Sequence, residues 1–450
     1  MEVRQMKKTF SGTNIAFHEL VSDRQITYDE FEVSINNFCA WITSFGIKPE
    51  EKIAIYCADK IEFQVIFWGC LRTGVVPVLI NHLISKDEVE YIIKDSNPKL
   101  AFVSDGLECD GVKNIQIESL FQILPLGVQY ASSKNFFVEC SQDADAFMLY
   151  TSGSTGKPKG VVHTRRSINT AVNTYKVALK LTPEDRVLSL SKMGFSYGFG
   201  SAISTLMCGA TVVLYEQKIN PAILNSIINS VNATVLCSVP TLYSIMASRG
   251  VDLTGIKCIS AGEPLKPALR NRLNADITDT WGATEVIGLL LIDGVPCNTD
   301  VKLVDDELWV APEALAIRYH NHYENTKEKF VGRWYRSGDV FREENGVYYY
   351  EGRNDDMFKV RGAWVSPTEL EDILNSHESV EESAVVGKID KDGLLKPFAY
   401  VVPNATVEKD ELRRHVIKHL HNNHKRLVGV DFVDSIPKTA TGKIQRYKFK

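Results

Sequence analysis

Apolar and polar positions alternate between two periods along residues 1–145. Short apolar runs of strand length, such as Lys52–Cys57, are followed by longer segments with a helical period, such as Asp59–Arg72. Thr27 with Glu30 three residues later is typical of a capping box that begins a helix. This alternation predicts parallel strands covered by helices on both faces.

The same alternation continues through the middle of the chain. Strands are expected at 186–190, 211–214 and 233–236, helices around 167–179, 199–208 and 220–231, and antiparallel strands at 301–310 and 347–350.

The composition changes at the polar residues 352–356, where a domain boundary is expected. The pattern predicts a core domain at 1–352, a hinge at 353–356 and a C-terminal domain at 357–450. The predicted fold class is α/β. The large N-terminal domain has helix-covered, largely parallel sheets plus a β-barrel-like portion, and the small, mobile C-terminal domain is α+β.

Composition excludes several classes of protein. The chain is 44% hydrophobic and 24% charged, as expected for a globular protein, and its net charge of −5 gives no electrostatic case for binding nucleic acid or anionic membranes. No apolar run reaches the about 18–20 residues of a membrane span, and residues 1–10 lack the apolar core of a signal peptide.

Cysteine and histidine usage favours a reducing cytoplasm without a structural metal. The nine cysteines are scattered and form no C-x-x-C pair, which argues against a disulfide framework or a zinc site. Four histidines gather at His415, His419, His421 and His424, and we interpret them as a solvated helix face rather than a metal site.

The segment Tyr150–Gly160 carries the strongest chemical signal. It contains three glycines, four Ser or Thr hydroxyls and two lysines between apolar flanks. Glycines let a backbone approach phosphate oxygens, while N–H, O–H and ammonium groups donate to them. The alternative is a flexible surface hairpin. The order of residues is not that of a Walker A loop, which disfavours a P-loop NTPase or kinase.

Five later segments complete a pattern that spans 150–446. They are Ser260–Leu265, Trp281–Glu285, Tyr335–Asp339, Gly352–Glu371 and Pro437–Arg446. In this order they resemble the adenylate-forming superfamily of acyl- and aryl-CoA ligases, stand-alone adenylation domains and luciferases. The segment 194–200 most resembles that of benzoate-type aryl-CoA ligases.

The resemblance implies roles for single residues. Thr284 and Glu285 would hold Mg²⁺ against the phosphates of ATP, Lys443 would contact the substrate carboxylate and the α-phosphate as a catalytic group, and Asp355 would be the hinge. Trp281 stands where most members have Tyr. The nucleotide would be bound by Thr151, Ser152, Gly153, Ser154, Thr155, Gly156, Lys159, Gly262, Glu263, Trp281, Asp339 and Arg353.

An acyl pocket is expected from residues 193–201, 239–243 and 282–290. The substrate-binding residues implied are Phe195, Ser196, Tyr197, Gly198, Gly282 and Gly288. No aspartate lies near Ser196 to bind an ammonium group, which disfavours an amino acid. Gly288 is interpreted as leaving room in the pocket. An aromatic or medium-sized apolar acid is expected, and the alternative is that these aromatic side chains only pack the core.

The implied reaction joins the acid to AMP with release of pyrophosphate and then transfers the acyl group to a thiol. Coenzyme A is the expected acceptor. The phosphopantetheine arm of a carrier protein is the alternative, because the segment between Glu285 and Tyr335 is short and Asp306 stands where glycine is usual. The expected protein is a cytoplasmic monomer or homodimer.

Overall fold

The computed structural model describes residues 10–129, 136–151, 157–313, 315–360, 363–389, 394–420, 426–438 and 444–449. The chain divides into a large unit, Met1–Val301 with Val310–Tyr335, and a small unit, Lys302–Trp309 with Arg336–Lys450. This division falls before residues 353–356. A division into compact units does not locate the residues about which one unit rotates, so the hinge at 353–356 stays a prediction.

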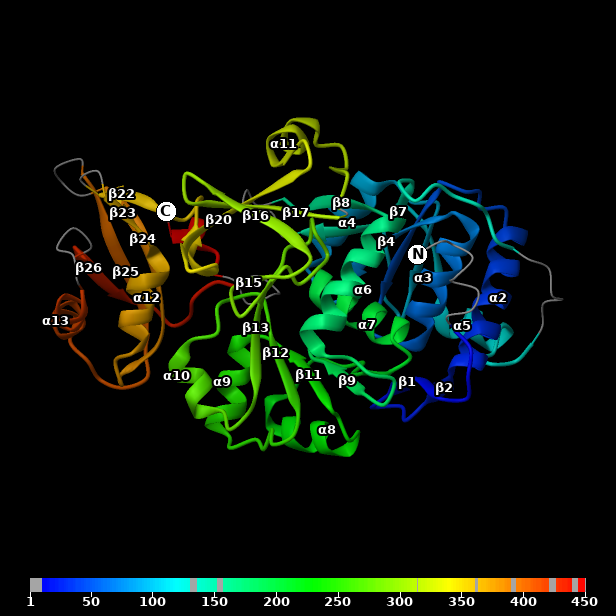
Figure 1. Ribbon diagram of the computed structural model, residues 1–450, viewed down its shortest axis with the longest axis horizontal. Coiled ribbons are helices and arrows are strands. Elements are labelled where there is room, and N and C mark those ends of the chain that lie inside the picture. Colours follow the sequence, from blue (N-terminus) through cyan, green and yellow to red (C-terminus); the bar gives the residue numbers. More distant parts are fainter. Residues whose placement is uncertain are drawn as a thin grey trace. The chain divides into compact units, whose positions relative to one another are not determined.

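Nine of the described strands form the first sheet of the large unit, and six of these run parallel (Figure 1). Their order is β15 (Val295–Pro296), β14 (Leu291–Ile292), β13 (Ile277–Trp281), β12 (Lys257–Ser260), β11 (Val235–Ser238), β9 (Arg186–Ser189), β10 (Thr211–Leu214), β1 (Ile15–Glu19) and β2 (Gln25–Thr27).

A second sheet of the large unit has seven described strands, of which five run parallel. Their order is β18 (Arg318–Tyr319), β8 (Lys159–Thr164), β7 (Asp145–Thr151), β4 (Val76–Asn81), β3 (Lys52–Cys57), β5 (Leu100–Val103) and β6 (Lys113–Gln116). The largely parallel sheets expected from the sequence are confirmed.

One core connects the two sheets. Buried residues of both sheets and of α2, α3, α6 and α7 belong to one continuous apolar cluster. Every residue of α3 is buried, as its apolar sequence requires. Helices α8, α9 and α10 lie on the side of the first sheet away from α6 and α7 (Figure 1). The helices are α2 (Tyr28–Ser44), α3 (Ile61–Thr73), α4 (Lys86–Ser96), α5 (Ile117–Ile123), α6 (Arg165–Leu179), α7 (Ser196–Met207), η1 (Pro221–Ile223), α8 (Leu224–Ser230), α9 (Pro240–Ser248), α10 (Pro267–Arg272) and α11 (Tyr323–Lys329).

The capping box predicted before α2 is confirmed, since the Thr27 side chain accepts from the Glu30 N–H while Glu30 accepts from the Thr27 N–H. Strands are present at 301–310, as expected from the sequence. Two strands lie there, joined by a turn at Asp305 and Asp306, whose φ angles of 51° and 64° are left-handed. That conformation favours glycine, the residue that the family resemblance implies at position 306.

A third sheet has the order β16 (Thr299–Val304), β17 (Glu307–Pro312), β20 (Trp334–Glu344) and β19 (Phe330–Val331), with β21 (Val347–Arg353) paired to β20. The division between the units runs through it. The small unit continues with β22 (Phe358–Val360), β23 (Ala363–Val365), β24 (Val380–Ile389), β25 (Leu395–Pro403) and β26 (Gly429–Phe432), and with α12 (Pro367–Asn375), α13 (Lys409–His419) and η3 (Arg446–Phe449). Its own apolar core lies among α12, α13 and β24–β26.

Candidate functional site

The glycine-rich loop is carried by a hairpin of the second sheet. Strands β7 and β8 pair antiparallel, and Thr151 lies opposite Lys159 where the pairing ends. The Tyr150 hydroxyl fixes this hairpin by donating to Asp95 at 2.7 Å. Thr151 and Lys159 thus lie at the carboxyl end of β7, the edge at which parallel sheets bind ligands. Five predicted phosphate-binding residues lie outside the described residues, namely Ser152, Gly153, Ser154, Thr155 and Gly156.

Glu285 is a buried carboxylate that lies close to this hairpin. Its Oε1 accepts a hydrogen bond from the Tyr319 hydroxyl at 2.6 Å, and the residue is only 8% exposed. The Lys159 ammonium lies 5.7 Å from the centroid of the Tyr319 ring, within cation–π range. Tyr319 therefore connects Lys159 with Glu285. No local pattern predicts Tyr319, because the pairing of β18 with β8 brings it there.

Thr284 links this corner to the predicted acyl segment. Its hydroxyl Oγ1 lies 3.2 Å from Oγ of Ser196, the first residue of α7. These two residues are 88 positions apart in the chain. The hydroxyl contact brings together two segments for which the sequence implied separate roles.

The residues present at this corner fit Mg²⁺. Thr284 and Glu285 offer hard oxygen donors, and Mg²⁺ is commonly held by one or two carboxylates together with substrate phosphates. Among the described residues, no group of three or more His, Cys, Asp or Glu side chains has the arrangement of a metal site. In the histidine group, His415 Nε2 instead lies 2.9 Å from the Ser376 hydroxyl, and His421 and His424 lie outside the described residues.

Three of the residues expected to bind the nucleotide lie at the carboxyl ends of two adjacent parallel strands. Gly262 and Glu263 follow β12, and Trp281 ends β13. Gly262 has a φ of +96°, which its lack of a side chain permits, and both it and Glu263 are exposed. After this turn, helix α10 begins at Pro267.

Tyr197 is fixed between α6 and the first sheet. Its hydroxyl donates to the backbone carbonyl of Ile259 at 2.9 Å, while its own carbonyl accepts from the Tyr175 hydroxyl at 3.1 Å. Gly198 is required by close packing, since a Cβ there would lie 2.2 Å from the Ser191 carbonyl oxygen. Phe195, Ser196 and Tyr197 are all partly exposed, as pocket-lining residues would be.

The glycines at 282 and 288 serve close packing. A Cβ on Gly282 would lie 2.1 Å from the carbonyl oxygen of Gly288, so the backbone at 282 and the backbone at 288 approach closely here. A Cβ on Gly288 would lie 3.0 Å from the Thr174 hydroxyl, so Thr174 packs against this glycine, and its role in the acid pocket stays a prediction. Between them, buried Ile287 has a φ of +44°, a conformation costing about 1–3 kcal/mol that packing must impose.

In the small unit, two residues expected to bind the nucleotide lie opposite each other on paired strands. Asp339 on β20 faces Arg353 on β21, and Arg353 Nε lies 3.3 Å from Asp339 Oδ1. Asp355 is exposed in the turn that follows, which closes on the Arg353 carbonyl through the N–H groups of Asp356 and Met357.

Lys443 lies outside the described residues, but the segments on both sides of it are described. A bridge pairs Lys438 with Ile444, and the Gln445 N–H donates to the Pro437 carbonyl at 2.8 Å. Arg446 then binds Glu371 with two hydrogen bonds, at 3.1 and 2.6 Å.

Two segments of the chain match known families. Residues 5–313 match the family described as AMP-binding enzyme, and residues 369–443 match the AMP-binding enzyme C-terminal domain. The chain is 33% identical to a 4-hydroxybenzoate–CoA/benzoate–CoA ligase of Rhodopseudomonas palustris, over 97% of this chain and 90% of that protein. It is also 33% identical to a benzoate–CoA ligase of Thauera aromatica, over 94% and 90%.

Solved structures show the same similarity. A benzoate CoA ligase from Burkholderia xenovorans LB400 superposes with a TM-score of 0.84 at 31% identity, covering 99% of this chain and 98% of that one. The anthranilate CoA ligase AuaEII, solved with anthranoyl-AMP, gives a TM-score of 0.86 at 26% identity over 99% and 95%. None of the described helices is both long and apolar enough to cross a bilayer.

Proposed function

The chain belongs to the AMP-binding enzyme family, and from this premise we propose that it joins an aromatic carboxylic acid to coenzyme A. The membership inferred from the motifs is thereby confirmed, as is the assignment to the AMP-forming acid–thiol ligases. ATP, Mg²⁺ and coenzyme A are the co-substrates that this class uses.

The contact between Ser196 and Thr284 carries the proposal. Ser196 belongs to the predicted acid segment 193–201, and Thr284 belongs to the predicted phosphate corner. An acid oxygen can attack the α-phosphorus only if the two substrates are bound side by side in line. The hydroxyl contact supports a site in which the acid adjoins the phosphates.

The reaction proceeds in two steps. A carboxylate oxygen forms a bond to the α-phosphorus of ATP, and pyrophosphate leaves with the electrons of the broken P–O bond. The CoA thiolate then attacks the acyl carbon, and the C–O bond to AMP breaks. Mg²⁺, held by Thr284 and Glu285, would neutralise phosphate charge. Lys159 and Lys443 would add positive charge during the first step, which is mostly positioning and electrostatics.

Two observations favour an aromatic acid. The two relatives that are 33% identical to this chain are named as ligases of benzoate and 4-hydroxybenzoate. Between residues 193 and 201 the chain has two Phe and one Tyr and lacks any acidic residue that would bind an ammonium group. We also infer a cytoplasmic location, since the nine cysteines, all described, are free thiols. A monomer or homodimer stays a prediction.

The decisive experiment measures ATP–pyrophosphate exchange with a panel of aryl, aliphatic and amino acids. Exchange that depends on benzoate or a hydroxybenzoate is expected, and CoA should then yield the aryl-CoA thioester with one AMP per turnover. Exchange only with amino acids would contradict the aromatic assignment. Acyl transfer to a holo carrier protein but not to CoA would favour the alternative acceptor.

A further inference from the structure

Asp59 and Lys192 form a buried ion pair that the proposed chemistry leaves without a role. Asp59 follows β3 of the second sheet and Lys192 follows β9 of the first, so the pair joins the carboxyl ends of two sheets within the large unit. Both side chains are 6% exposed, and Nζ lies 3.8 Å from Oδ2. Buried charges are costly unless further hydrogen bonds compensate for the lost water. The other contacts of Asp59 and Lys192 therefore indicate which part of the chain the pair positions.

Both side chains also form hydrogen bonds with backbone groups. The Lys192 ammonium donates to the carbonyls of Tyr215 and Gln217, the latter at 2.8 Å. Oδ1 of Asp59 accepts from the N–H of Met193 at 3.0 Å. Burial raises the pKa of Asp59 to about 6, against the opposing charge of Lys192. The pair thus fixes the backbone at residues 192–193 from two sides.

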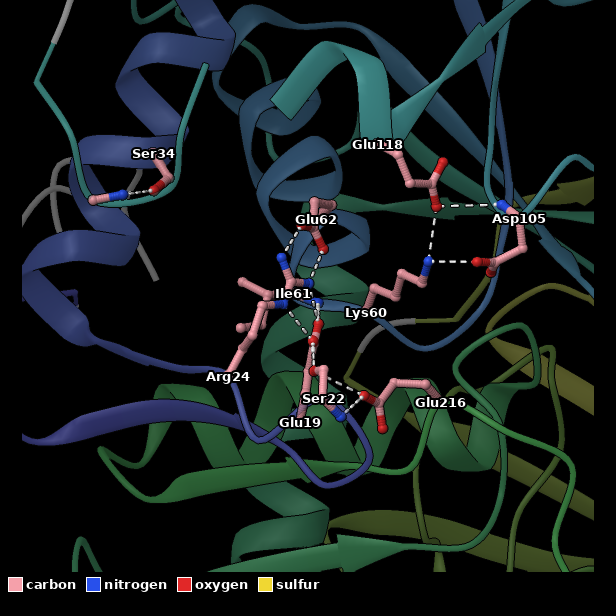
Figure 2. Close-up of polar contacts among 11 residues, drawn as sticks. Glu19, Ser22, Arg24, Ser34, Lys60, Ile61, Glu62, Asp105, Glu118 and Glu216 are labelled. Atoms are coloured by element: carbon pink, nitrogen blue, oxygen red, sulfur yellow. Dashed lines mark hydrogen bonds and ion pairs between the residues drawn. The ribbon is translucent and has the colours of Figure 1, made fainter. Parts of the chain in front are cut away.

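The neighbours of the pair are themselves anchored. Lys60, next to Asp59, binds Asp105 at 2.8 Å and Glu118 at 2.7 Å (Figure 2). Glu216, next to Tyr215, accepts from the backbone N–H of Ser22 at 3.1 Å (Figure 2). The groups that hold residues 192–193 therefore have little freedom to move.

The segment that follows is closely packed at Met193 and Gly194. The Met193 sulfur accepts from Gln64 Nε2 at 3.1 Å, and a Cβ on Gly194 would lie 2.4 Å from Cα of Asn81. The cavity beside Asp59 has about 10 Å³, space for roughly one water molecule. Met193 and Gly194 lead directly to Phe195 and Ser196, and the Ser196 hydroxyl meets Thr284, so the backbone connects the ion pair with the acid segment.

We propose that Asp59 and Lys192 are positioning residues for the acid site, setting the backbone of 193–196 and through it the Ser196 hydroxyl against Thr284. The proposal rests on the proposed function, in which this segment contacts the acid. A displacement of about 1 Å in a reacting geometry costs about 10²-fold in rate. Small movements of this segment would consequently be visible in kinetics.

Hydrogen–deuterium exchange of the full-length protein tests the positioning step without catalysis. The Met193 N–H donates to Asp59, and the Phe195 N–H donates to the Lys192 carbonyl at 2.9 Å, so both amides should be protected. Asp59→Ala and Lys192→Met should accelerate exchange in peptides spanning 190–199. Asp59→Asn keeps an acceptor for the Met193 N–H and should restore protection.

Lys257→Met is the matched control. Lys257 also pairs with a buried aspartate of the large unit, Asp185 at 3.0 Å, but it begins β12 at the opposite strand end. This variant should leave exchange at 190–199 unchanged. Acceleration by Lys257→Met equal to that by Lys192→Met would reduce the effect to general loosening and overturn the proposal.

Kinetics test the consequence at the site. Asp59→Ala and Lys192→Met should raise KM for the acid roughly 10- to 100-fold while KM for ATP changes less than about threefold, and Asp59→Asn should stay near wild type. Equal changes in both KM values would contradict the proposal. If the wild type forms no AMP with any acid, the proposed function fails. If hydrogen–deuterium exchange at 190–199 is unchanged in both Asp59→Ala and Lys192→Met, the positioning role itself is refuted.

Discussion

Two buried ion pairs, one in each unit, are built on different chemistry. In the small unit Arg446 binds Glu371 with two hydrogen bonds and reaches Asp356 with a third at 2.8 Å. In the large unit Lys192 stands 3.8 Å from Asp59 and directs its hydrogen bonds to backbone carbonyls. Arginine's planar fork suits carboxylates, whereas lysine's compact ammonium suits converging carbonyls.

This difference separates two tasks. The Arg446 guanidinium neutralises the carboxylates of Glu371 and Asp356, so its loss would leave uncompensated negative charge in the small unit. The Lys192 ammonium and the Asp59 carboxylate each hold backbone, so their loss displaces a loop. We therefore expect the first pair to govern stability and the second to govern geometry.

Arg446→Met should have the largest effect on stability. Removing one partner of a buried ion pair typically costs about 3–5 kcal/mol, because the remaining charge is left uncompensated. The free energy of unfolding of the small unit should fall by this amount in urea titrations followed by pulse proteolysis. A double variant, Arg446→Met with Glu371→Met, should regain much of the loss.

Arg413→Met is the control for that series. Arg413 pairs with Asp410 on the exposed surface of α13 at 3.0 Å, and exposed pairs contribute at most about 1 kcal/mol. If Arg446→Met is no more destabilising than Arg413→Met, the contrast between the two buried pairs is lost.

Lys443→Ala should separate chemistry from folding in the same segment. Loss of one transition-state charge donor is expected to slow adenylation by about 10²–10³-fold. Stability should match the wild type, and thioester formation from supplied acyl-adenylate should survive much better. Rapid-quench measurement of each half-reaction checks this. Equal loss in both half-reactions would remove Lys443 from its assigned role.

Glu307→Gln should have an intermediate effect, confined to ATP. Glu307 is buried, accepts a hydrogen bond from the Gly338 N–H at 3.0 Å and binds Arg336 at 2.9 Å. Gly338 directly precedes Asp339, the residue expected to bind the nucleotide. Losing a hydrogen bond to a charged group costs about 1.5–3 kcal/mol. KM for ATP should rise roughly tenfold or more, with KM for the acid unchanged.

Arg342→Met provides the comparison, since Arg342 pairs with Glu344 and Glu351 on the exposed part of the same β20–β21 hairpin. It should leave KM for ATP within about twofold of wild type. A rise equal to that of Glu307→Gln would show that any disturbance of the hairpin suffices.

The smallest effect should appear in the pH dependence of stability. Burial lowers the pKa of His163 to about 3. Below pH 6.5 the unfolded chain therefore binds one more proton than the folded chain, and the free energy of unfolding decreases as the pH is lowered. Burial raises the pKa of Asp59 to about 6, so this group has the opposite dependence between about pH 4 and 6.

Substitution of these two groups should change the slope in opposite directions. His163→Phe, which preserves a ring stacked on Phe147, should flatten the acid-side loss of stability, whereas Asp59→Asn should steepen it. Each change is at most about 1.4 kcal/mol per pH unit. Urea midpoints between pH 4.5 and 6 measure it, and slope changes of the same sign would contradict the assignment.

The sequence predicted local structure and motif residues well. The Thr27 cap and the alternating strands and helices are set by patterns within a few residues. Glu371 and Arg446 were each part of a predicted motif. Their pairing with each other, 75 residues apart, was not predictable because no local pattern reports it.

Tertiary packing decided the rest of the site. Tyr319 reaches Glu285 only through the pairing of β18 with β8. Thr174 packs against Gly288, a contact that no local pattern reports. Lys192 did carry a signal, since it is a single charge within an apolar run, and its partner Asp59 follows a buried strand.

The central claim, an acyl-adenylate formed by direct attack of the acid on ATP, is tested most directly with benzoate labelled with ¹⁸O in both carboxylate oxygens. Mass spectrometry of the products with ATP and CoA should find one ¹⁸O in the phosphate of AMP and one in the thioester carbonyl. Label in inorganic phosphate with formation of ADP, or AMP without label, would contradict the account.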